Sequence, residues 1–418
     1  MKGFSETEIG IAGYTTSGEG IPGHIKDSPA DFIVDEIPLD FPRDPNGKYL
    51  HIKVRLTNWD TNHFLGELAG MLRISRKRIS YAGTKDKRGV TTQWFCINAD
   101  VSDIQPAMKD VEVIEQYRSP AMIRLGDLLG NRFSIRIEAN ANFSDRIMSI
   151  SRDLSEAGFI NFFGPQRFGA QRPITHRVGK LLLMGKYEDA VDEYICDPAI
   201  DTEWFRLEYE KSRDAREALK NFPLHLSNER VLLQKILEGR KSEAFDYLPM
   251  QLKILFVHAY QSYIFNRIVS KRFEVTRSVL ETQIGDVCVP MDGFGNPGND
   301  QIKVTPFNQQ KIAGLVRSGK AAITAPLPGY ESAIEGGLQG DIERELLEME
   351  MISHSSFSIE GHPELSSKGS RRSISGVLAD FQSSDGNWVS FALGKGMYAT
   401  SVMREFLRNP DMTVYSGP

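Results

Sequence analysis

The sequence predicts an α+β protein in which two strand-rich segments flank a helical middle. Strand-like alternation of apolar and polar residues recurs before about residue 140 and returns near residue 390. From about residue 160 onward, apolar residues recur with the helical period of roughly 3.6 residues. Because one hydrophobic core rarely grows past roughly 250 residues, the chain of 418 residues should hold two or three domains.

The N-terminal segment contains the clearest strands. Phe32 and Val34, with Glu36 as a weaker third member, share one face of "DFIVDEI", and "HIKVRL" alternates in the same way. Asn62 is a suitable N-cap for the helix that follows, because its side chain can accept hydrogen bonds from the first free amides. Two further strands are expected at "VTTQWFCIN" and "NRFSIRIE", and an amphipathic helix at residues 143–157.

The rest of the chain is predicted to be helical and then mixed. Helical periodicity covers residues 175–194, 205–221, 228–238 and 249–272. Short strands with Gly and Pro turns are expected at 278–327, and a loop or linker at 353–375. A strand, "NWVSFAL", and a helix, "TSVMREFL", close the chain. This return to the first pattern fits a C-terminal segment that rejoins the first domain.

The composition favours a cytoplasmic protein. Hydrophobic residues make up 40% and charged residues 25% of the chain, as in globular proteins. No apolar run approaches the ~20 residues of a membrane span, and the first residues lack the apolar core of a signal peptide. Cys96, Cys196 and Cys288 form no C-x-x-C pair, and the eight histidines are scattered. Neither a disulfide scaffold nor a metal centre is therefore expected.

Positive charge is concentrated around one carboxylate, although the whole chain carries a net charge of −5. From Arg73 to Arg88 there are seven basic residues and one acid, Asp86, which lies between Gly83 and Gly89. Such a patch can bind RNA phosphates through local counterion release, but a solvated helix surface gives the same pattern. Asp86 is a candidate nucleophile or base because nearby cations keep a carboxylate ionised; the alternative is a turn residue with surface ion pairs.

Motifs for bound nucleotides or metals have little support. Two G-x-G-x-x-G strings begin at Gly18 and Gly293, but each has proline before its third glycine and no helix directly after it. Both are expected to be turns rather than dinucleotide sites. The P-loop, H-E-x-x-H and G-x-S-x-G motifs do not occur in the sequence. We therefore expect chemistry by side chains alone, with no cofactor.

Aromatic residues provide a second candidate feature. Phe32, Phe133 and Tyr398 each lie on or beside a predicted strand, next to polar residues. A flipped base needs an apolar or aromatic face and a polar partner at its edge. Asn131 can offer both a donor and an acceptor to a uracil. Taken singly, each aromatic residue has core packing as an alternative role.

Together these segments resemble the TruD family of tRNA pseudouridine synthases over nearly the whole chain. The Gly-x-Lys-Asp…Thr-x-Gln motif is highly specific for that family. Six stretches resemble family motifs in the same order: "HIKDSPADFIVDEIP", "YAGTKDKRGVTTQ", "GNRFSIRI", "NFFGPQRFG", "HAYQSYIFN" and "GMYATSVMREFL".

The resemblance implies an α+β fold: a pseudouridine-synthase catalytic domain with a bent antiparallel sheet, and an inserted, mostly helical TRUD domain. The expected catalytic domain is discontinuous, formed by residues 1–158 and 374–418, with the insertion at 159–373. The implied activity is isomerisation of uridine to pseudouridine at position 13 of tRNA. No cofactor, no membrane and no obligate protein partner are implied.

The motifs carry functional residues onto this sequence. Asp86 matches the catalytic aspartate, and Lys26 the lysine expected to pair with it and hold its charge. Phe32, Asn131 and Tyr398 match residues that contact the target uridine, with Phe133 expected to line the pocket. This chain has Tyr398 where some members have Phe, and Arg88-Gly89 where a pair such as His-Ala is frequent; neither departure should disturb the roles. The candidate RNA-binding residues are Lys85, Lys87, Arg88, Arg132 and Arg167.

Two questions stay open at this level. Asp86 either attacks C1′ of the ribose or removes a ribose proton to give a glycal-like intermediate. Arg167, in "NFFGPQRFG", either contacts RNA or belongs to a rigid hinge braced by Phe162 and Phe168. The alternative function for the whole chain is a non-catalytic tRNA-binding protein or chaperone.

Overall fold

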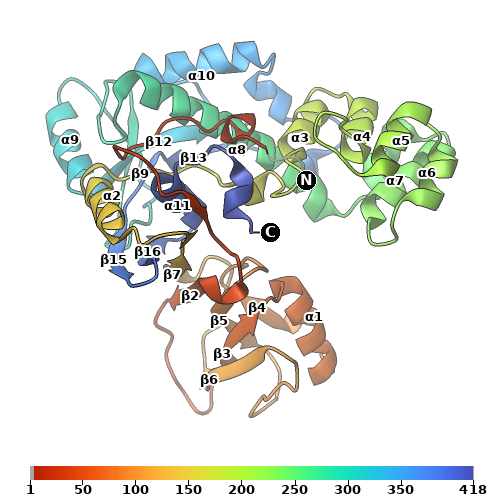
Figure 1. Cartoon of the computed structure of the whole chain (residues 1–418), viewed down its shortest axis with the longest axis horizontal. Helices are drawn as coiled ribbons and strands as arrows, with labels where there is room; N and C mark the ends of the chain where they lie inside the picture. The colour runs from red at the N-terminus through yellow and green to blue at the C-terminus, as the bar shows by residue number, and fades with distance from the viewer. Residues whose placement is uncertain (1–3, 418) are drawn as a thin grey trace.

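The computed structural model describes residues 4–417, and its central element is an eight-stranded sheet. The strand order is β15-β16-β7-β2-β5-β3-β6, with β4 added on β5. Figure 1 shows this sheet running from the larger body of the molecule into a smaller lobe that also holds helix α1 (Thr61–Leu72). The strands are β2 (Phe32–Pro38), β3 (Tyr49–Thr57), β4 (Ile79–Tyr81), β5 (Val90–Ile97), β6 (Val111–Ser119), β7 (Leu128–Arg136), β15 (Ala379–Ser384) and β16 (Trp388–Gly394).

The sheet confirms the predicted α+β class with one difference. It is antiparallel except between β2 and β5, which run parallel. Two of its strands, β15 and β16, come from the end of the chain, and β16 pairs with β7 along seven residues. The predicted strand–helix return near the C-terminus is thus present in the structure.

The alternation in β2 corresponds to a buried face and a more exposed one. Phe32, Val34 and Glu36 are all buried, and on the neighbouring strand Val34 lies opposite Phe133, while Glu36 lies opposite Asn131. Because side chains alternate across a strand, these residues share one side of the sheet. Glu36, the polar residue of this set, is therefore buried in the interior, where its charge needs a partner.

Helix α1 (Thr61–Leu72) covers β3 and β5. It begins at Thr61, one residue before Asn62, which was the predicted N-cap. Asp60, not Asn62, is the N-cap, since its carboxylate accepts hydrogen bonds from the amides of Asn62 (2.9 Å) and His63 (3.0 Å). A charged cap is especially favourable at a helix N-terminus. Phe64 of α1 packs against Phe95 of β5 with ring centroids 4.9 Å apart.

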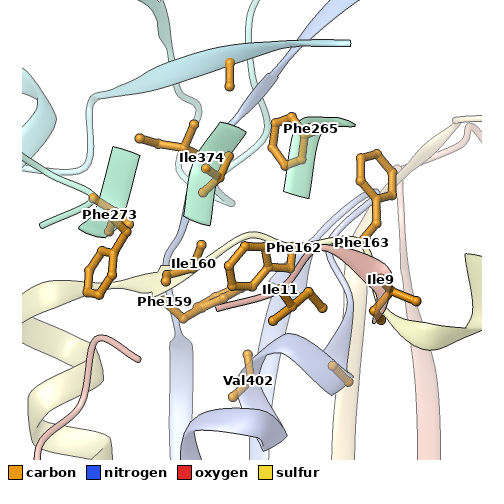
Figure 2. Packing of buried hydrophobic residues seen from close by; sticks show 14 of the residues in the cluster. Ile9, Ile11, Phe159, Ile160, Phe162, Phe163, Phe265, Phe273, Ile374 and Val402 are labelled. Atoms are coloured by element: carbon orange, nitrogen blue, oxygen red, sulfur yellow. The ribbon is translucent and has the colours of Figure 1, made fainter. Parts of the chain in front are cut away.

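The main core lies where the two ends of the chain meet the long helix α8 (Met250–Thr276). Figure 2 shows Phe159, Ile160 and Phe162 between Phe265 and Phe273 of α8 on one side and Val402 of α11 on the other. Asn266 of α8 fixes this junction, because its side chain accepts from the amide of Phe163 (2.9 Å) and donates to the carbonyls of Phe163 and Ile9 (3.1 and 3.0 Å).

Helices α3 to α7 form a helical lobe at the right of Figure 1. Strands β10 to β13 form a second sheet in the order β11-β10-β12-β13, and the pairs β1-β8 and β9-β14 form two-stranded sheets. The helices are α2 (Ser144–Ala157), α3 (Thr175–Leu183), α4 (Tyr187–Ile195), α5 (Trp204–Ser212), α6 (Ala215–Asn221), α7 (Ser227–Leu237), α8 (Met250–Thr276), α9 (Gln309–Arg317), α10 (Gly337–Met349) and α11 (Ala399–Leu407). The smaller strands are β1 (Gly23–His24), β8 (Glu138–Ala139), β9 (Phe159–Ile160), β10 (Val287–Pro290), β11 (Ile302–Lys303), β12 (Ala321–Leu327), β13 (Ser370–Ser373) and β14 (Ser375–Gly376).

The helical middle agrees with the predicted ranges, except that two of them are broken. The range 175–194 holds α3 and α4, and the range 205–221 holds α5 and α6. Residues 353–375, predicted as a loop, contain short 3-10 helices and β13, which pairs with β12. Among the helices within residues 4–417, none is both long and apolar enough to cross a membrane.

Candidate active site

The carboxylate of Asp86 lies in the loop that joins β4 to β5. At the end of this loop Gly89 has φ +153°, and a Cβ on it would lie 2.6 Å from the carbonyl oxygen of Phe32. Only glycine allows this backbone conformation and this close approach together. The amide of Lys85 donates to the hydroxyl of Thr61, at the first turn of α1, over 3.1 Å. The loop is thus held at both ends, with Asp86 between them.

Lys26 forms an ion pair with Asp86 across 60 positions of sequence. Its Nζ donates to Oδ2 of Asp86 over 2.8 Å, and it lies 4.0 Å from the centroid of the Phe32 ring. The Lys26 side chain is 4% exposed, whereas that of Asp86 is 40% exposed. Burying an ammonium is costly unless it is paired, so this geometry fixes one carboxylate oxygen and leaves the group open to a ligand.

Asp86 borders a cavity of about 640 Å³, a size suited to a nucleoside-sized ligand. The cavity brings together residues from β2, β7, the Asp86 loop, the α11 N-terminus and the junction near α8. Of the residues predicted from sequence, those that line it are Phe32, Lys85, Asp86, Asn131, Phe133, Arg167 and Tyr398.

The cavity walls are aromatic and partly polar. Phe32 and Phe133 make an edge-to-face contact with centroids 6.3 Å apart, and Tyr398 packs edge-on to Phe163 at 5.9 Å. Such rings offer apolar faces against which a planar ligand can pack.

Three buried oxygens in this cavity have no hydrogen-bond partner within the described chain: Oδ1 of Asn131, Oε1 of Gln166 and Oγ1 of Thr400. All three residues line the cavity. Buried polar atoms are nearly always satisfied in folded proteins, and each exception calls for an explanation. Their convergence on one hollow indicates a site built for a polar ligand, with Asn131 on the same sheet face as Phe133.

Comparisons with known proteins identify the family of this chain. The family model for tRNA pseudouridine synthase D (TruD) matches residues 8–406. A "Probable tRNA pseudouridine synthase D" of Picrophilus torridus is 43% identical over 404 residues, covering 96% of this chain and 97% of that protein. A protein of the same name from Thermoplasma volcanium is 44% identical over 385 residues, covering 90% of this chain and 92% of its own.

The chain belongs to the TruD family. A crystal structure from Methanosarcina mazei, named "Putative tRNA pseudouridine synthase D (TruD)", superposes with a TM-score of 0.79 at 35% identity, covering 98% of both chains. The α+β fold described above is therefore that of a TruD-family member.

The remaining predicted residues of this TruD-family chain lie outside the cavity lining. Lys87 is exposed on the loop, and Arg88 lies against the C-terminal turn, 3.0 Å from where a Cβ on Gly417 would stand. Arg132 points to the opposite side of the sheet from Asn131 and pairs with Asp380 over 2.7 Å. Any RNA contact by Arg132 would therefore be made on that other face, away from the cavity.

Lys85 differs from its predicted role as a phosphate-facing cation. Its side chain is 6% exposed and its Nζ lies 3.1 Å from Oε2 of Glu36, which is 2% exposed. Burial raises the pKa of Glu36, and the Lys85 ammonium partly offsets this rise. The other carboxylate oxygen accepts from the amide of Trp94 (3.3 Å). Sequence reasoning missed Glu36, although its position on the alternating face of β2 was the available signal.

Arginines at the junction form a second group that sequence reasoning largely missed. Arg167 donates to the hydroxyl of Ser262 (3.2 Å), and burial lowers its pKa. Arg372 donates to Oδ1 of Asn161 (2.7 Å) and to the carbonyl of Gly396 (2.9 Å). Burial lowers the pKa of Arg372 to about 10. Because Gly396 lies two residues before Tyr398, Arg372 positions the turn that carries this ring.

Proposed function

We propose that this protein isomerises uridine to pseudouridine in tRNA, at position 13, by a cofactor-free mechanism that depends on Asp86. The proposal rests on one observation above all. A carboxylate anchored by a buried lysine borders a nucleoside-sized cavity with aromatic walls and unpartnered oxygens. The names of the TruD relatives point to the same activity.

The reaction breaks the bond between uracil N1 and ribose C1′, rotates the freed base and joins C5 to C1′. The hydrogen at C5 is then lost to solvent, and N1 gains a proton. Substrate and product are isomers, so no redox partner or energy source is required. The target nucleotide must first leave its stack, which costs a few kcal/mol.

Asp86 supplies the reacting group. It either attacks C1′, which gives a covalent intermediate that the returning C5 displaces, or it removes a ribose proton to give a glycal-like intermediate. Both routes need an ionised carboxylate with a fixed position. The ammonium of Lys26, 2.8 Å away, forms an ion pair with the carboxylate and holds one of its oxygens. The second oxygen is the one proposed to meet the sugar.

The cavity walls hold the base between bond breaking and bond formation. Phe32, Phe133 and Tyr398 provide faces against which a uracil can stack and turn without leaving. The unpartnered Oδ1 of Asn131 can accept the hydrogen of the uracil N3. Lys87, Arg88, Arg132 and Arg167 are the proposed contacts to the surrounding RNA.

The proposal includes the division of the chain and its location. Residues 1–158 and 374–418 would form the catalytic domain, and 159–373 the insertion. In support, β15 and β16 belong to the same sheet as strands of the first segment, and α11 contacts α2 of that segment, while β13, ending at Ser373, pairs with β12 of the second sheet. We place the activity in the cytoplasm, where tRNA is processed.

The test is tritium release from an in vitro transcribed tRNA labelled at uracil C5. The wild type should release tritium, and a transcript with cytidine at position 13 should release none from that position. Asp86→Asn should abolish release while tRNA affinity stays within a few-fold, because the amide is isosteric but not nucleophilic. Asp385→Asn, at an exposed carboxylate in the turn between β15 and β16 and outside the cavity lining, is the matched control and should remain active.

Turnover by Asp86→Asn would refute the assignment of this residue. A wild type that binds tRNA but releases no tritium would instead favour a non-catalytic tRNA-binding protein or chaperone. In that case Asp86→Asn should leave RNA binding and any chaperone activity intact.

A further inference from the structure

The mouth of the candidate cavity carries one conspicuous apolar side chain. Leu125 is 78% exposed, although it lines the same hollow as Asp86. Among the large apolar side chains that line the cavity within residues 4–417, Leu125 alone is mostly exposed to solvent. A single exposed leucine elsewhere on a surface would need no explanation. Leu125 calls for an explanation because it lines the same cavity as Asp86.

The turn that carries Leu125 is held firmly in place. The amide of Gly126 donates to the carbonyl of Ala82 (2.8 Å), at the start of the Asp86 loop. The amide of Arg124 donates to Oδ2 of Asp127 (2.8 Å), and Lys395 donates through Nζ to the carbonyl of Gly126 (3.3 Å). The exposed side chain is thus presented by a fixed backbone and not by a loose loop.

The turn also connects the two sides of the cavity. Ala82 lies at the start of the Asp86 loop, and Lys395 lies just before the turn that carries Tyr398. Leu125 therefore keeps a set distance from both the carboxylate and one aromatic wall. Arg124, exposed next to it, adds a positive charge on the solvent side, as a backbone phosphate would require.

We propose that Leu125 is an apolar wedge that enters the RNA base stack at the place left by the extruded uridine. The inference rests on the function proposed above. A cavity of about 640 Å³ suits a nucleoside-sized ligand, and the bases that flank the target in the RNA stack would lie beside Leu125. Proteins that distort nucleic acids insert leucine and similar side chains between bases. The same contact would bury the exposed leucine and offset part of the cost of unstacking.

The experiment compares Leu125→Ala with wild type in single-turnover pseudouridine formation on two RNAs. The first is the folded tRNA transcript, and the second is the same tRNA with an abasic site next to the target, which leaves the target poorly stacked. On folded tRNA the rate should fall about 10- to 100-fold, with tRNA affinity within about threefold. On the abasic RNA the variant should approach the wild-type rate, because less unstacking is needed.

Two further variants sharpen the result. Leu125→Met keeps a long apolar side chain and should stay within about threefold of wild type. Leu224→Ala removes another leucine, 82% exposed but remote from the cavity lining, and should have no effect. A 2-aminopurine beside the target should brighten on binding of wild type and less on binding of Leu125→Ala.

The outcomes separate the two proposals. A wild type that forms no pseudouridine in either RNA refutes the proposed function, and the wedge with it. If wild type is active and Leu125→Ala matches it on folded tRNA, the wedge alone is refuted. A loss of rate that the abasic RNA does not relieve also refutes it, and assigns Leu125 to a different contact.

Discussion

The buried ion pair between Glu36 and Lys85, the residue before Asp86, gives a quantitative prediction for the stability of the fold. The two charges lie 3.1 Å apart with side chains 2% and 6% exposed. At an effective dielectric constant of about 20 their attraction is about 5 kcal/mol, most of which offsets the cost of taking both ions out of water. Glu36→Gln leaves the Lys85 ammonium buried without its counter-charge. We expect it to lower the free energy of unfolding by about 3–5 kcal/mol.

The complementary variant should behave differently because a carboxyl group can discharge. Lys85→Met leaves Glu36 buried without its ammonium, and burial already raises the pKa of Glu36. A raised folded-state pKa means that the native state binds a proton that the unfolded state has lost, so stability is lost as pH rises through that pKa. Lys85→Met should therefore be much less destabilising near pH 5 than near pH 8.

The assay is urea unfolding of wild type, both single variants and the double variant Glu36→Gln/Lys85→Met. The double variant has no buried charge, so its stability should lie within about 1–2 kcal/mol of wild type, and the cycle should give a coupling energy above about 2 kcal/mol. If the losses of the two single variants simply add in the double variant, the two side chains do not interact as argued. A loss below about 1 kcal/mol for Glu36→Gln would also contradict the buried-pair account.

Two further predictions concern the junction. Arg372→Lys keeps a charge but cannot hold both Asn161 and Gly396, so the turn of Tyr398 should loosen; we expect a rate loss of about tenfold in tritium release, with tRNA affinity nearly unchanged. An unchanged rate would show that Arg372 does not position the ring. His176 is buried, and burial lowers its pKa to about 3 from 6.5. Because only the unfolded state then takes up the proton, this group should cost about 2 kcal/mol of stability between pH 6.5 and pH 5. In urea unfolding, His176→Phe should lack this loss, and an equal pH dependence in variant and wild type would contradict it.

Local patterns in the sequence sufficed for much of the fold. The alternation at Phe32 and Val34 gave the strand and its buried face, and helical periodicity gave the long helix α8 within a few residues at each end. The break between α3 and α4 was not visible, because both helices carry the same apolar period across Gly185, whose positive φ ends the pattern only in the folded chain. The 3-10 helices at 353–375 were missed because their turns are too short to show a period.

The residues of the candidate site that belong to sequence motifs could be predicted. The ion-pair and hydrogen-bond partners of its charged side chains could not. Charge and glycine spacing singled out Asp86, and a resemblance added Lys26. Neither showed that Lys85, one residue before Asp86, would turn inward to Glu36. Nor did any local signal mark Arg372, whose partners lie far away in the sequence.

The sequence by itself determined where the main helices and several of the strands lie. It also singled out Asp86 as the candidate carboxylate. Both are possible because periodicity and residue type act over a few neighbouring positions. Only the tertiary structure decided which cations face solvent and which are buried, and which oxygens stay unpartnered in the cavity. The physical reason is that the cost of a buried charge depends on what lies within a few ångströms. That neighbourhood is assembled here from β2, β7, the Asp86 loop and the two ends of the chain.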